Sequence, residues 1–300
     1  MWRSDEGVAP YRCLCQSKQT DKPKFEAVTH RQHDKGATMI ITSLLENTSA
    51  RPGIAAEHGL SLYIETATRR ILFDMGQTDL FARNAEVLGI DLARVDLAVL
   101  SHGHYDHGGG LAAFLEINKT APVYLTEAAF LPHYNGTQKY IGLDISLQGH
   151  PRLRAVSGDL SLGSGLTLLS PNGRERKHSL GAFGLTERVG DVFIPDDFRH
   201  EQYLLIEEPL SEGGRRVLIS GCSHAGIRDI MEWFSPDVLI GGFHVSKMAL
   251  GEELTALGEA LAAHGTEYYT CHCTGMEQYA FLQKRMPRLG YLAGGETLRI

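Results

Sequence analysis

The chain from Met39 onward is a series of short runs whose apolar residues recur with the period of a strand or of a helix. Apolar runs bounded by Gly, Asp or Ser predict strands. In the segment 79–89, Leu80, Phe81, Ala85 and Leu88 lie near one helical face and Gly89 provides a stop. The expected order in this part of the chain is strand 39–48, strand 59–66, strand 69–76, helix 79–89, strand 96–101 and helix 109–117.

The last hundred residues alternate in the same way. The expected order there is strand 201–210, strand 215–220, helix 225–234, strand 237–242, helix 252–265, strand 267–270 and helix 275–286. Each half of the chain moves from strands to strand–helix alternation. Two sheets stacked between outer helices, in one α/β domain of residues 39–300, would satisfy this pattern.

Two segments depart from this alternation. Residues 131–200 are rich in Gly, Pro, Asn, Asp and His, and within them 152–170 predicts two or three short strands. We interpret the flanking stretches 134–150 and 176–201 as long loops that shape a cleft. Residues 1–38 are polar and lack periodicity, which predicts a disordered extension or translated sequence upstream of a start at Met39.

Composition narrows the function classes. The 300 residues are 43% hydrophobic and 22% charged, which is typical of a globular protein. No run approaches the roughly 18–20 apolar residues of a membrane-spanning helix. Five cysteines do not form an evident disulfide framework, and the N-terminus lacks an apolar stretch of signal length, so we expect a cytoplasmic protein. A formal net charge of −7 argues against binding to nucleic acid or to an anionic membrane.

The strongest chemical signal is a histidine-rich loop at 101–107, between an expected strand and an expected helix. His102 and His104 are two residues apart, so in an extended loop both imidazoles can reach one ion. Asp106 and His107 follow where the chain turns into the helix, and they can bind a second ion nearby. This pattern therefore predicts a metal site.

Two later histidines also follow expected strands. His224 lies in Gly-Cys-Ser-His-Ala-Gly at 221–226, and His272 lies in Cys-His-Cys-Thr-Gly at 271–275. Together they complete the set, with His224 a third ligand for the first ion and His272 a ligand for the second. Three protein ligands and an open position are typical of a catalytic ion, whereas a structural site uses all four positions.

The H-x-H-x-D-H sequence resembles that of the metallo-β-lactamase superfamily, and the two later histidines fall where that family has its third and last histidine ligands. Four further segments resemble motifs of a subgroup that is labelled dihydropterin-ribofuranosyl-aminobenzene-phosphate synthase-like. They are residues 72–78, 221–227, 240–244 and 271–275. The resemblance covers roughly residues 39–300. It implies a four-layer αββα sandwich, a binuclear metal site and a supporting role for Asp74 behind the metal ligands.

One position departs from the superfamily pattern. Typical members have a bridging Asp at a strand end about twenty residues after the third histidine, where this chain has His244. Asp229 and Asp237 are poorly placed to substitute. An imidazole has one lone pair, whereas a carboxylate has two oxygens that can join two ions. Our hypothesis is that His244 binds one ion terminally or contacts substrate, and that Asp106 and His244 act in catalysis.

Several further residues are assigned roles outside this ligand set. Cys222, Cys271 and Cys273 are expected to be packed thiols, and Cys13 and Cys15 are assigned no role. Thr274 and Gly275 open a helix that either binds an anion or is simply capped. Asp196, Asp197 and Glu201 are expected to be solvated charges. The candidates for substrate contact in the middle segment are His133, His150, His178 and His200.

The function expected from these features is a metal-dependent hydrolase that uses metal-activated water on a small ester, lactone, thioester or phosphoester. Two divalent ions are expected, with zinc favoured and manganese or iron as alternatives. The other enzyme reading is a transferase or synthase acting on a pterin or phosphoribosyl precursor. A non-catalytic metal-binding sensor is the third. A nuclease is disfavoured because cations such as Arg174, Arg176 and Lys177 are scattered.

Overall fold

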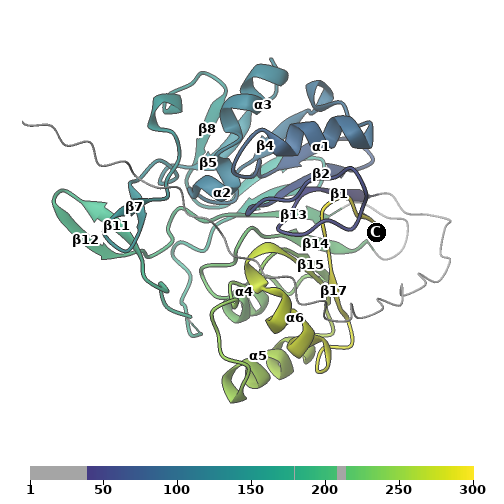
Figure 1. Cartoon of the computed structure of the whole chain (residues 1–300), viewed down its shortest axis with the longest axis vertical. Coiled ribbons are helices and arrows are strands. Elements are labelled where there is room, and N and C mark those ends of the chain that lie inside the picture. Colours follow the sequence, from purple (N-terminus) through teal and green to yellow (C-terminus); the bar gives the residue numbers. More distant parts are fainter. Residues whose placement is uncertain (1–38, 179, 208–213) are drawn as a thin grey trace, which may run out of the picture. The chain divides into compact units, whose positions relative to one another are not determined.

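The strands expected from the apolar runs pair into two seven-stranded sheets that pack face to face (Figure 1). The computed structural model describes residues 39–178, 180–207 and 214–300. The extension expected at 1–38 lies outside these residues. The described residues belong to one compact unit, 37–300.

The first sheet has the order β18-β1-β2-β3-β4-β5-β8. It is antiparallel from β18 to β3 and parallel from β3 to β8. The strands span Ile40–Leu45 (β1), Ser61–Glu65 (β2), Arg70–Phe73 (β3), Leu97–Val99 (β4), Val123–Thr126 (β5), Leu153–Val156 (β8) and Thr297–Arg299 (β18).

The second sheet has the order β17-β16-β15-β14-β13-β10-β9. Its strands are parallel from β14 to β17 and antiparallel elsewhere. They span Leu160–Gly163 (β9), Leu166–Leu169 (β10), Tyr203–Glu207 (β13), Arg216–Ile219 (β14), Val238–Ile240 (β15), Glu267–Thr270 (β16) and Leu289–Tyr291 (β17).

Helices cover the outer face of each sheet, which confirms the αββα sandwich (Figure 1). One apolar cluster fills the space between the sheets, and two further clusters join each sheet to its helices. The helices on the first sheet are α1 (Leu80–Leu88) and α3 (Leu111–Ile117), and those on the second are α4 (Ile227–Phe234), α5 (Glu252–Ala262) and α6 (Met276–Gln283). Short helices are α2 (Tyr105–Gly108), η1 (Leu92–Arg94), η2 (Ile145–Leu147) and η3 (His272–Thr274). None of the helices in the described ranges combines the length and apolar character needed to cross a bilayer.

The middle segment differs from the expectation. The two or three short strands expected in 152–170 are present as three, β8, β9 and β10. The interpretation of 134–150 and 176–201 as long loops is wrong, because they contribute most of a third sheet with the order β12-β11-β6-β7. Its strands span His133–Asn135 (β6), Lys139–Tyr140 (β7), Leu185–Val189 (β11) and Val192–Pro195 (β12). These strands are short and partly exposed; β7 and β11 lack a continuous apolar run, and the apolar run of β12 is mostly exposed.

The topology places the expected site residues at one edge. Asp74 follows β3, the 101–107 loop follows β4, and His224, His244 and His272 follow β14, β15 and β16. We call these loops together the strand-end edge. Ligands of open α/β sheets commonly bind at the carboxyl ends of parallel strands.

Candidate metal centre

The strand-end edge contains unusual backbone conformations. Asp74, Ser223, His244 and His272 have φ values of 58°, 58°, 53° and 45°. A non-glycine residue in this left-handed region costs of order 1–3 kcal/mol and persists only where the surroundings enforce it. Four such residues on the strand-end loops indicate that the fold holds this edge in a defined shape.

Three histidines from both sheets form the first donor group. His102, His104 and His224 are all buried, and one ring nitrogen of each lies within 4.8 Å of the others. In the described part of the chain, His102 Nε2, His104 Nε2 and both nitrogens of His224 have no hydrogen-bond partner. Burial lowers the pKa of all three rings well below the ordinary value. The group is therefore a set of neutral nitrogen donors, which is what a divalent ion requires.

Asp74 determines which ring nitrogen is presented by His102 of this group and by the neighbouring His107. Its carboxylate accepts hydrogen bonds from Ser101 N, Ser101 Oγ and His107 Nδ1, each at 2.7 Å. Because the Ser101 hydroxyl donates to Asp74, its oxygen accepts from His102 Nδ1 at 2.8 Å. His102, which burial keeps neutral, then carries its proton on Nδ1 and leaves its Nε2 lone pair free; the neutral form of His107 does the same. The supporting role expected for Asp74 fits this geometry.

The Asp74 carboxylate also changes the pKa of His107. Burial lowers the pKa of His107, but the Asp74 carboxylate outweighs this effect and raises the pKa to about 9. A buried carboxylate–imidazole pair of this kind is a common support for a metal-binding histidine.

A second donor group lies beside the first. Asp106 Oδ2 is 3.4 Å from His272 Nε2 and 3.1 Å from His58 Nε2. The ring of His107 is centred 4.9 Å from that of His272 and 4.1 Å from that of His102, so the two groups adjoin. Burial raises the pKa of Asp106, but the facing histidines hold it well below its usual range. This group combines one carboxylate with imidazole nitrogens.

Asn47 fixes the orientation of the His272 ring through hydrogen bonds on the side away from Asp106. Asn47 Oδ1 accepts from Gly59 N at 3.2 Å, and Asn47 Nδ2 donates to the His272 carbonyl at 3.2 Å. Since Oδ1 is thereby an acceptor, His272 Nδ1, 2.8 Å away, is the donor. The Nε2 lone pair of His272 therefore faces Asp106.

His58 belongs to this group although sequence reasoning missed it. Its side chain is 58% exposed and lies in a loop before β2. A single histidine among Gly, Ala and Glu residues carries no motif, and only the fold brings it to Asp106.

His244 lies against the first group. Its ring is centred 4.2 Å from that of His224, and its Nδ1 is buried without a hydrogen-bond partner among the described residues. Thr274 Oγ1 accepts from Phe243 N at 2.9 Å and so holds the loop that carries His244. This places Thr274 in a positioning role, and metal or substrate binding by His244 stays a prediction.

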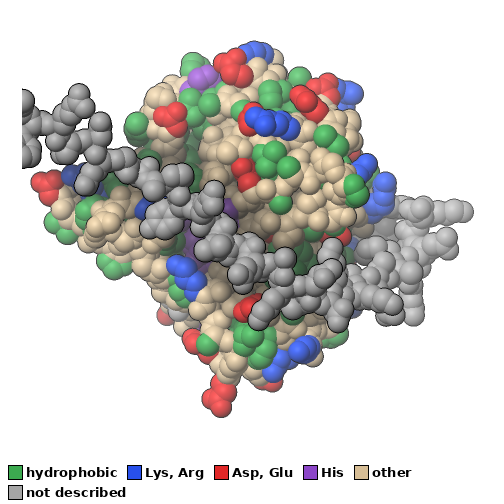
Figure 2. Space-filling view, in the orientation of Figure 1, with side chains coloured by type: hydrophobic (Ala, Val, Ile, Leu, Met, Phe, Trp, Pro, Cys, Tyr) green, Lys and Arg blue, Asp and Glu red, His purple; other side chains and the backbone are tan. Residues whose placement is uncertain are grey.

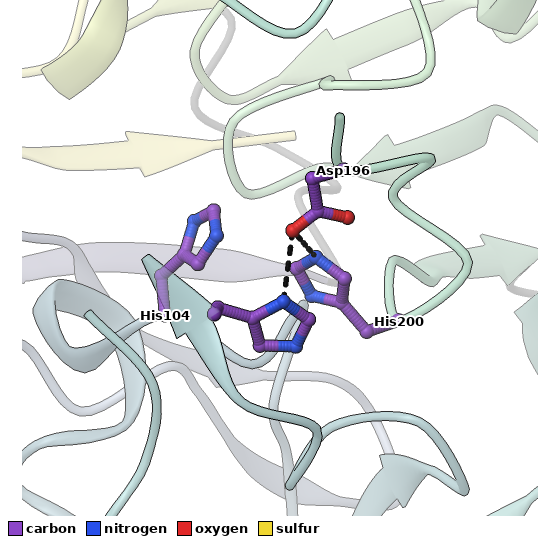
Figure 3. A group of neighbouring side chains, drawn as sticks. His104, Asp196 and His200 are labelled. Atoms are coloured by element: carbon purple, nitrogen blue, oxygen red, sulfur yellow. Dashed lines mark hydrogen bonds and ion pairs between the residues drawn. The ribbon is translucent and has the colours of Figure 1, made fainter. Parts of the chain in front are cut away.

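A further buried cluster adjoins His104 (Figure 3). Asp196 Oδ2 lies 2.8 Å from His133 Nδ1 and 3.3 Å from His200 Nε2. Gly103 N donates to His200 Nδ1 at 2.9 Å, so the neutral His200 ring carries its proton on Nε2, toward Asp196. The Nδ1 lone pair of His200 therefore already accepts the hydrogen bond from Gly103 N. The cluster connects the third sheet to the peptide between His102 and His104.

Two of the three acidic residues expected to be solvated are buried. Asp196 belongs to the cluster in Figure 3. Glu201 accepts from His224 N at 2.7 Å, Ala225 N at 2.8 Å and Tyr203 Oη at 2.7 Å, and so fixes the His224 loop. The expectation holds for Asp197, whose side chain is 59% exposed.

The other candidates lie apart from these donor groups. His178 Nε2 is 2.7 Å from Glu232 Oε1 on α4, and Arg152 N donates to His150 Nδ1 at 3.3 Å. Asp229 accepts from the backbone of 177 and 178, and Asp237 accepts from Arg216 N. Both aspartates thus accept backbone hydrogen bonds away from the donor groups, in line with the expectation that neither replaces the bridging Asp.

Comparison with known proteins shows which family this chain resembles. A sequence model described as the metallo-beta-lactamase superfamily matches residues 55–202. An uncharacterized protein of Methanocaldococcus jannaschii is 27% identical over 247 residues, which cover 79% of this chain and 91% of that protein. The 7,8-dihydropterin-6-methyl-4-(beta-D-ribofuranosyl)-aminobenzene-5'-phosphate synthase of the same organism is 30% identical over 253 residues, covering 74% of this chain and 82% of the synthase.

A solved structure is similar over most of its length. Tm1679, described as a metal-dependent hydrolase of the beta-lactamase superfamily, is 28% identical with a TM-score of 0.75. The match covers 87% of this chain and 99% of that one.

Proposed function

Since this chain belongs to the metallo-β-lactamase superfamily, we propose that it is a hydrolase that uses two divalent ions bound at the strand-end edge. The observation that carries the proposal is the set of buried, unpaired nitrogen donors on His102, His104 and His224 among the described residues. A buried polar atom without a partner is costly, so such a set indicates that a ligand completes it.

The residues divide between two ions. His102, His104 and His224 would hold the first, and Asp106, His107 and His272 would hold the second. His58 is placed to add a donor to the second ion from the exposed side. Imidazole with one carboxylate suits zinc, and also iron or manganese. A bound divalent ion lowers the pKa of water and so supplies a nucleophile near neutral pH.

The protein groups around this centre have separate tasks. Asp74 and Asn47 direct the Nε2 lone pairs of His102, His107 and His272 toward the ions. Glu201 holds the backbone of the His224 loop. Asp106 would bind metal, and His244, beside His224, would bind the first ion or the substrate. These roles suit hydrolysis of a small ester, lactone, thioester or phosphoester.

A small-molecule substrate is favoured over nucleic acid. Lys and Arg side chains are interspersed with Asp and Glu on the face shown in Figure 2. Phosphate backbones are gripped by clustered cations, and the formal net charge of the chain is −7. We also propose a cytoplasmic location.

A second candidate function follows from one relative. The synthase of Methanocaldococcus jannaschii is 30% identical over 74% of this chain. A transferase or synthase acting on a pterin or phosphoribosyl precursor is therefore the alternative, and it would use the same metal centre.

Metal content tests the proposal first. We expect the full-length chain to bind two equivalents by mass spectrometry after loading with zinc, manganese or iron. His102→Ala removes one donor of the first ion and should lower the content, whereas His264→Ala, which changes an exposed histidine, should not. One equivalent or less in the unaltered protein would contradict the binuclear centre.

Substrate assays then separate the two functions. A panel of chromogenic esters, lactones, thioesters and phosphoesters should reveal metal-dependent turnover that His102→Ala abolishes. If the loaded protein hydrolyses none of them but joins a pterin to a phosphoribosyl substrate, the synthase reading replaces the hydrolase.

A further inference from the structure

A cavity of about 400 Å³ lies near the metal centre but does not contain its donors. Its wall is formed by the loops that follow β5, β8 and β10 and by the segment 199–202 before β13. We call it the β5–β8 cavity. None of the residues that line it belongs to the donor groups of the proposed metal centre. Small-molecule sites commonly have volumes of about 300–1,000 Å³ and often lie at the carboxyl ends of strands, as this cavity does.

One residue of the wall is a buried hydrogen-bond acceptor without a partner. Gln202 is 1% exposed, and its Nε2 donates to the carbonyls of Leu100 at 2.8 Å and Tyr124 at 3.2 Å. Because both of these partners are acceptors, the orientation of the amide is fixed and Oε1 is on its other side. Among the described residues this oxygen has no partner. A buried acceptor in this state is costly, so a donor from a ligand would satisfy it.

Two further acceptors of the wall are also unpaired in the part of the chain that the structure describes. The Glu127 carboxylate makes no ion pair or hydrogen bond there, and Asn172 donates its Nδ2 to the Arg199 carbonyl at 2.8 Å while its Oδ1 accepts nothing. Arg199 is the one arginine of the wall, and its guanidinium already pairs with Glu187 at 2.7 Å and with Asp197 at 3.1 Å. The cavity therefore presents acceptors and negative charge.

We propose that the β5–β8 cavity binds a small organic cation with N–H donors, an amine or a guanidinium compound. Its donors would reach Gln202 Oε1 and Asn172 Oδ1, and its charge would pair with the Glu127 carboxylate. An anion is disfavoured, because the arginine of the wall is already paired with two acids. The inference needs no bound metal and stands independently of the proposed function.

The rest of the wall suits an organic molecule rather than a bare ion. Ala128, Leu131 and Val156 add apolar surface beside the polar groups. A calcium ion takes about six to eight oxygen ligands at about 2.3–2.6 Å, whereas Glu127 is the one carboxylate on the wall of this cavity. A cation with a short apolar stem therefore fits the space better than an inorganic ion does.

The cavity wall also supports the loop that carries the first metal ligands. Gln202 N donates to the Ser101 carbonyl at 2.8 Å, and Thr126 Oγ1 donates to the His200 carbonyl at 3.1 Å. His200 in turn accepts a hydrogen bond from the backbone of the 101–107 loop. An occupant of the cavity would thus contact residues that position this loop without itself touching an ion.

Four ligands of similar size test the chemistry of the cavity. Butylguanidinium and butylamine carry N–H donors and a positive charge, whereas butanol is neutral and butyrate is an anion. We expect the full-length protein to bind the two cations in calorimetric titrations and to bind butanol and butyrate at least about 10-fold more weakly. Binding should be the same after loading with zinc and after chelation, because no donor of the metal centre lines the cavity.

Two variants locate the binding. Glu127→Gln keeps the shape and removes the charge at an exposed position, so butylguanidinium should bind about 10-fold more weakly. Ser157→Trp, also at an exposed position of the wall, should fill the cavity and abolish binding. Glu116→Gln, which changes an exposed carboxylate on α3, should bind as the unaltered protein does. Circular dichroism checks that each variant is folded.

Several results would overturn the inference. Unchanged binding in folded Glu127→Gln and Ser157→Trp would place the cation elsewhere, and loss of binding on chelation would place it on the metal ions. Equal binding of butyrate would indicate an anion site, and displacement of butylguanidinium by Ca²⁺ would indicate an inorganic cation. No detectable binding of either organic cation would overturn it as well. The binuclear centre is tested separately by metal content and stands or falls without these results.

Discussion

At the scale of single residues, the metal-facing histidines depend on hydrogen bonds on the opposite side of each ring. His102 Nδ1 bonds to Ser101, His107 Nδ1 to Asp74, and His272 Nδ1 to Asn47. Each bond fixes a tautomer, and the tautomer decides whether Nε2 is a donor or a lone pair. In the proposed metal centre, the residues behind the rings would therefore affect metal binding as well as the rings themselves.

Asp74→Asn tests this dependence. Asparagine has the same shape and tolerates the left-handed backbone at this position, where φ is 58°. Its amide would donate toward His107 Nδ1 where the carboxylate accepts, so the ring would move its proton to Nε2. We expect about 10–100-fold weaker binding of the second ion in a metal titration. Asp79→Asn, which changes a half-exposed residue paired with Arg83, should bind metal normally. Equal affinity in both variants would contradict the tautomer argument.

The sequence is sufficient to predict residues whose spacing is itself a signal. His102, His104, Asp106 and His107 lie within six positions, and the structure places them in two adjoining groups. His58 and Glu201 carry no such signal, because folding brings them to residues far away in the chain. Their roles depend on contacts that no local pattern records.

At the scale of elements, packing against a sheet is what makes a segment predictable. The helix expected at 79–89 forms as α1, because Phe81, Ala82 and Ala85 bury one face against the first sheet. The third sheet was missed because β6 and β7 are only three and two residues long and have no apolar period, and because the short apolar run of β12 is mostly exposed. Gly190 and Asp191 between β11 and β12 are a two-residue hairpin signal that could have indicated this pair.

The end of α1 is a test of local backbone preference. Gly89 has φ of 74° and caps α1 by donating its N–H to the carbonyls of residues 85 and 86. A Cβ at this position meets no atom within 4 Å, so a change here is free of clashes. Gly89→Ala should lower the free energy of unfolding by about 1 kcal/mol in urea denaturation, because alanine disfavours the left-handed region. Gly89→Asn should lose less free energy of unfolding, since asparagine tolerates the left-handed region. An equal loss in both variants would show that the left-handed backbone is not the reason for glycine at this position.

At the scale of the whole described unit, the metal centre joins the two sheets. The first sheet supplies Asp74 and the 101–107 loop, and the second supplies His224, His244 and His272. The third sheet reaches the same place through Asp196 and His200, whose ring accepts from Gly103 N. Ions bound here would connect loops from both halves of the sandwich, because no single strand or helix among the described residues supplies all the donors.

Removal of the ions should therefore weaken the whole sandwich rather than one loop. A ligand that binds only the folded state stabilises it by about 2.7 kcal/mol when its free concentration is a hundred times its dissociation constant. For a chain of this size we expect chelation to lower the melting temperature by several degrees, at about 2–4 °C for each kcal/mol. Calorimetry should show one transition with and without metal, because the apolar cluster between the sheets is shared. His102→Ala should respond less to chelation than the unaltered protein. Separate transitions on chelation, or an unchanged melting temperature, would show that the centre does not couple the two sheets.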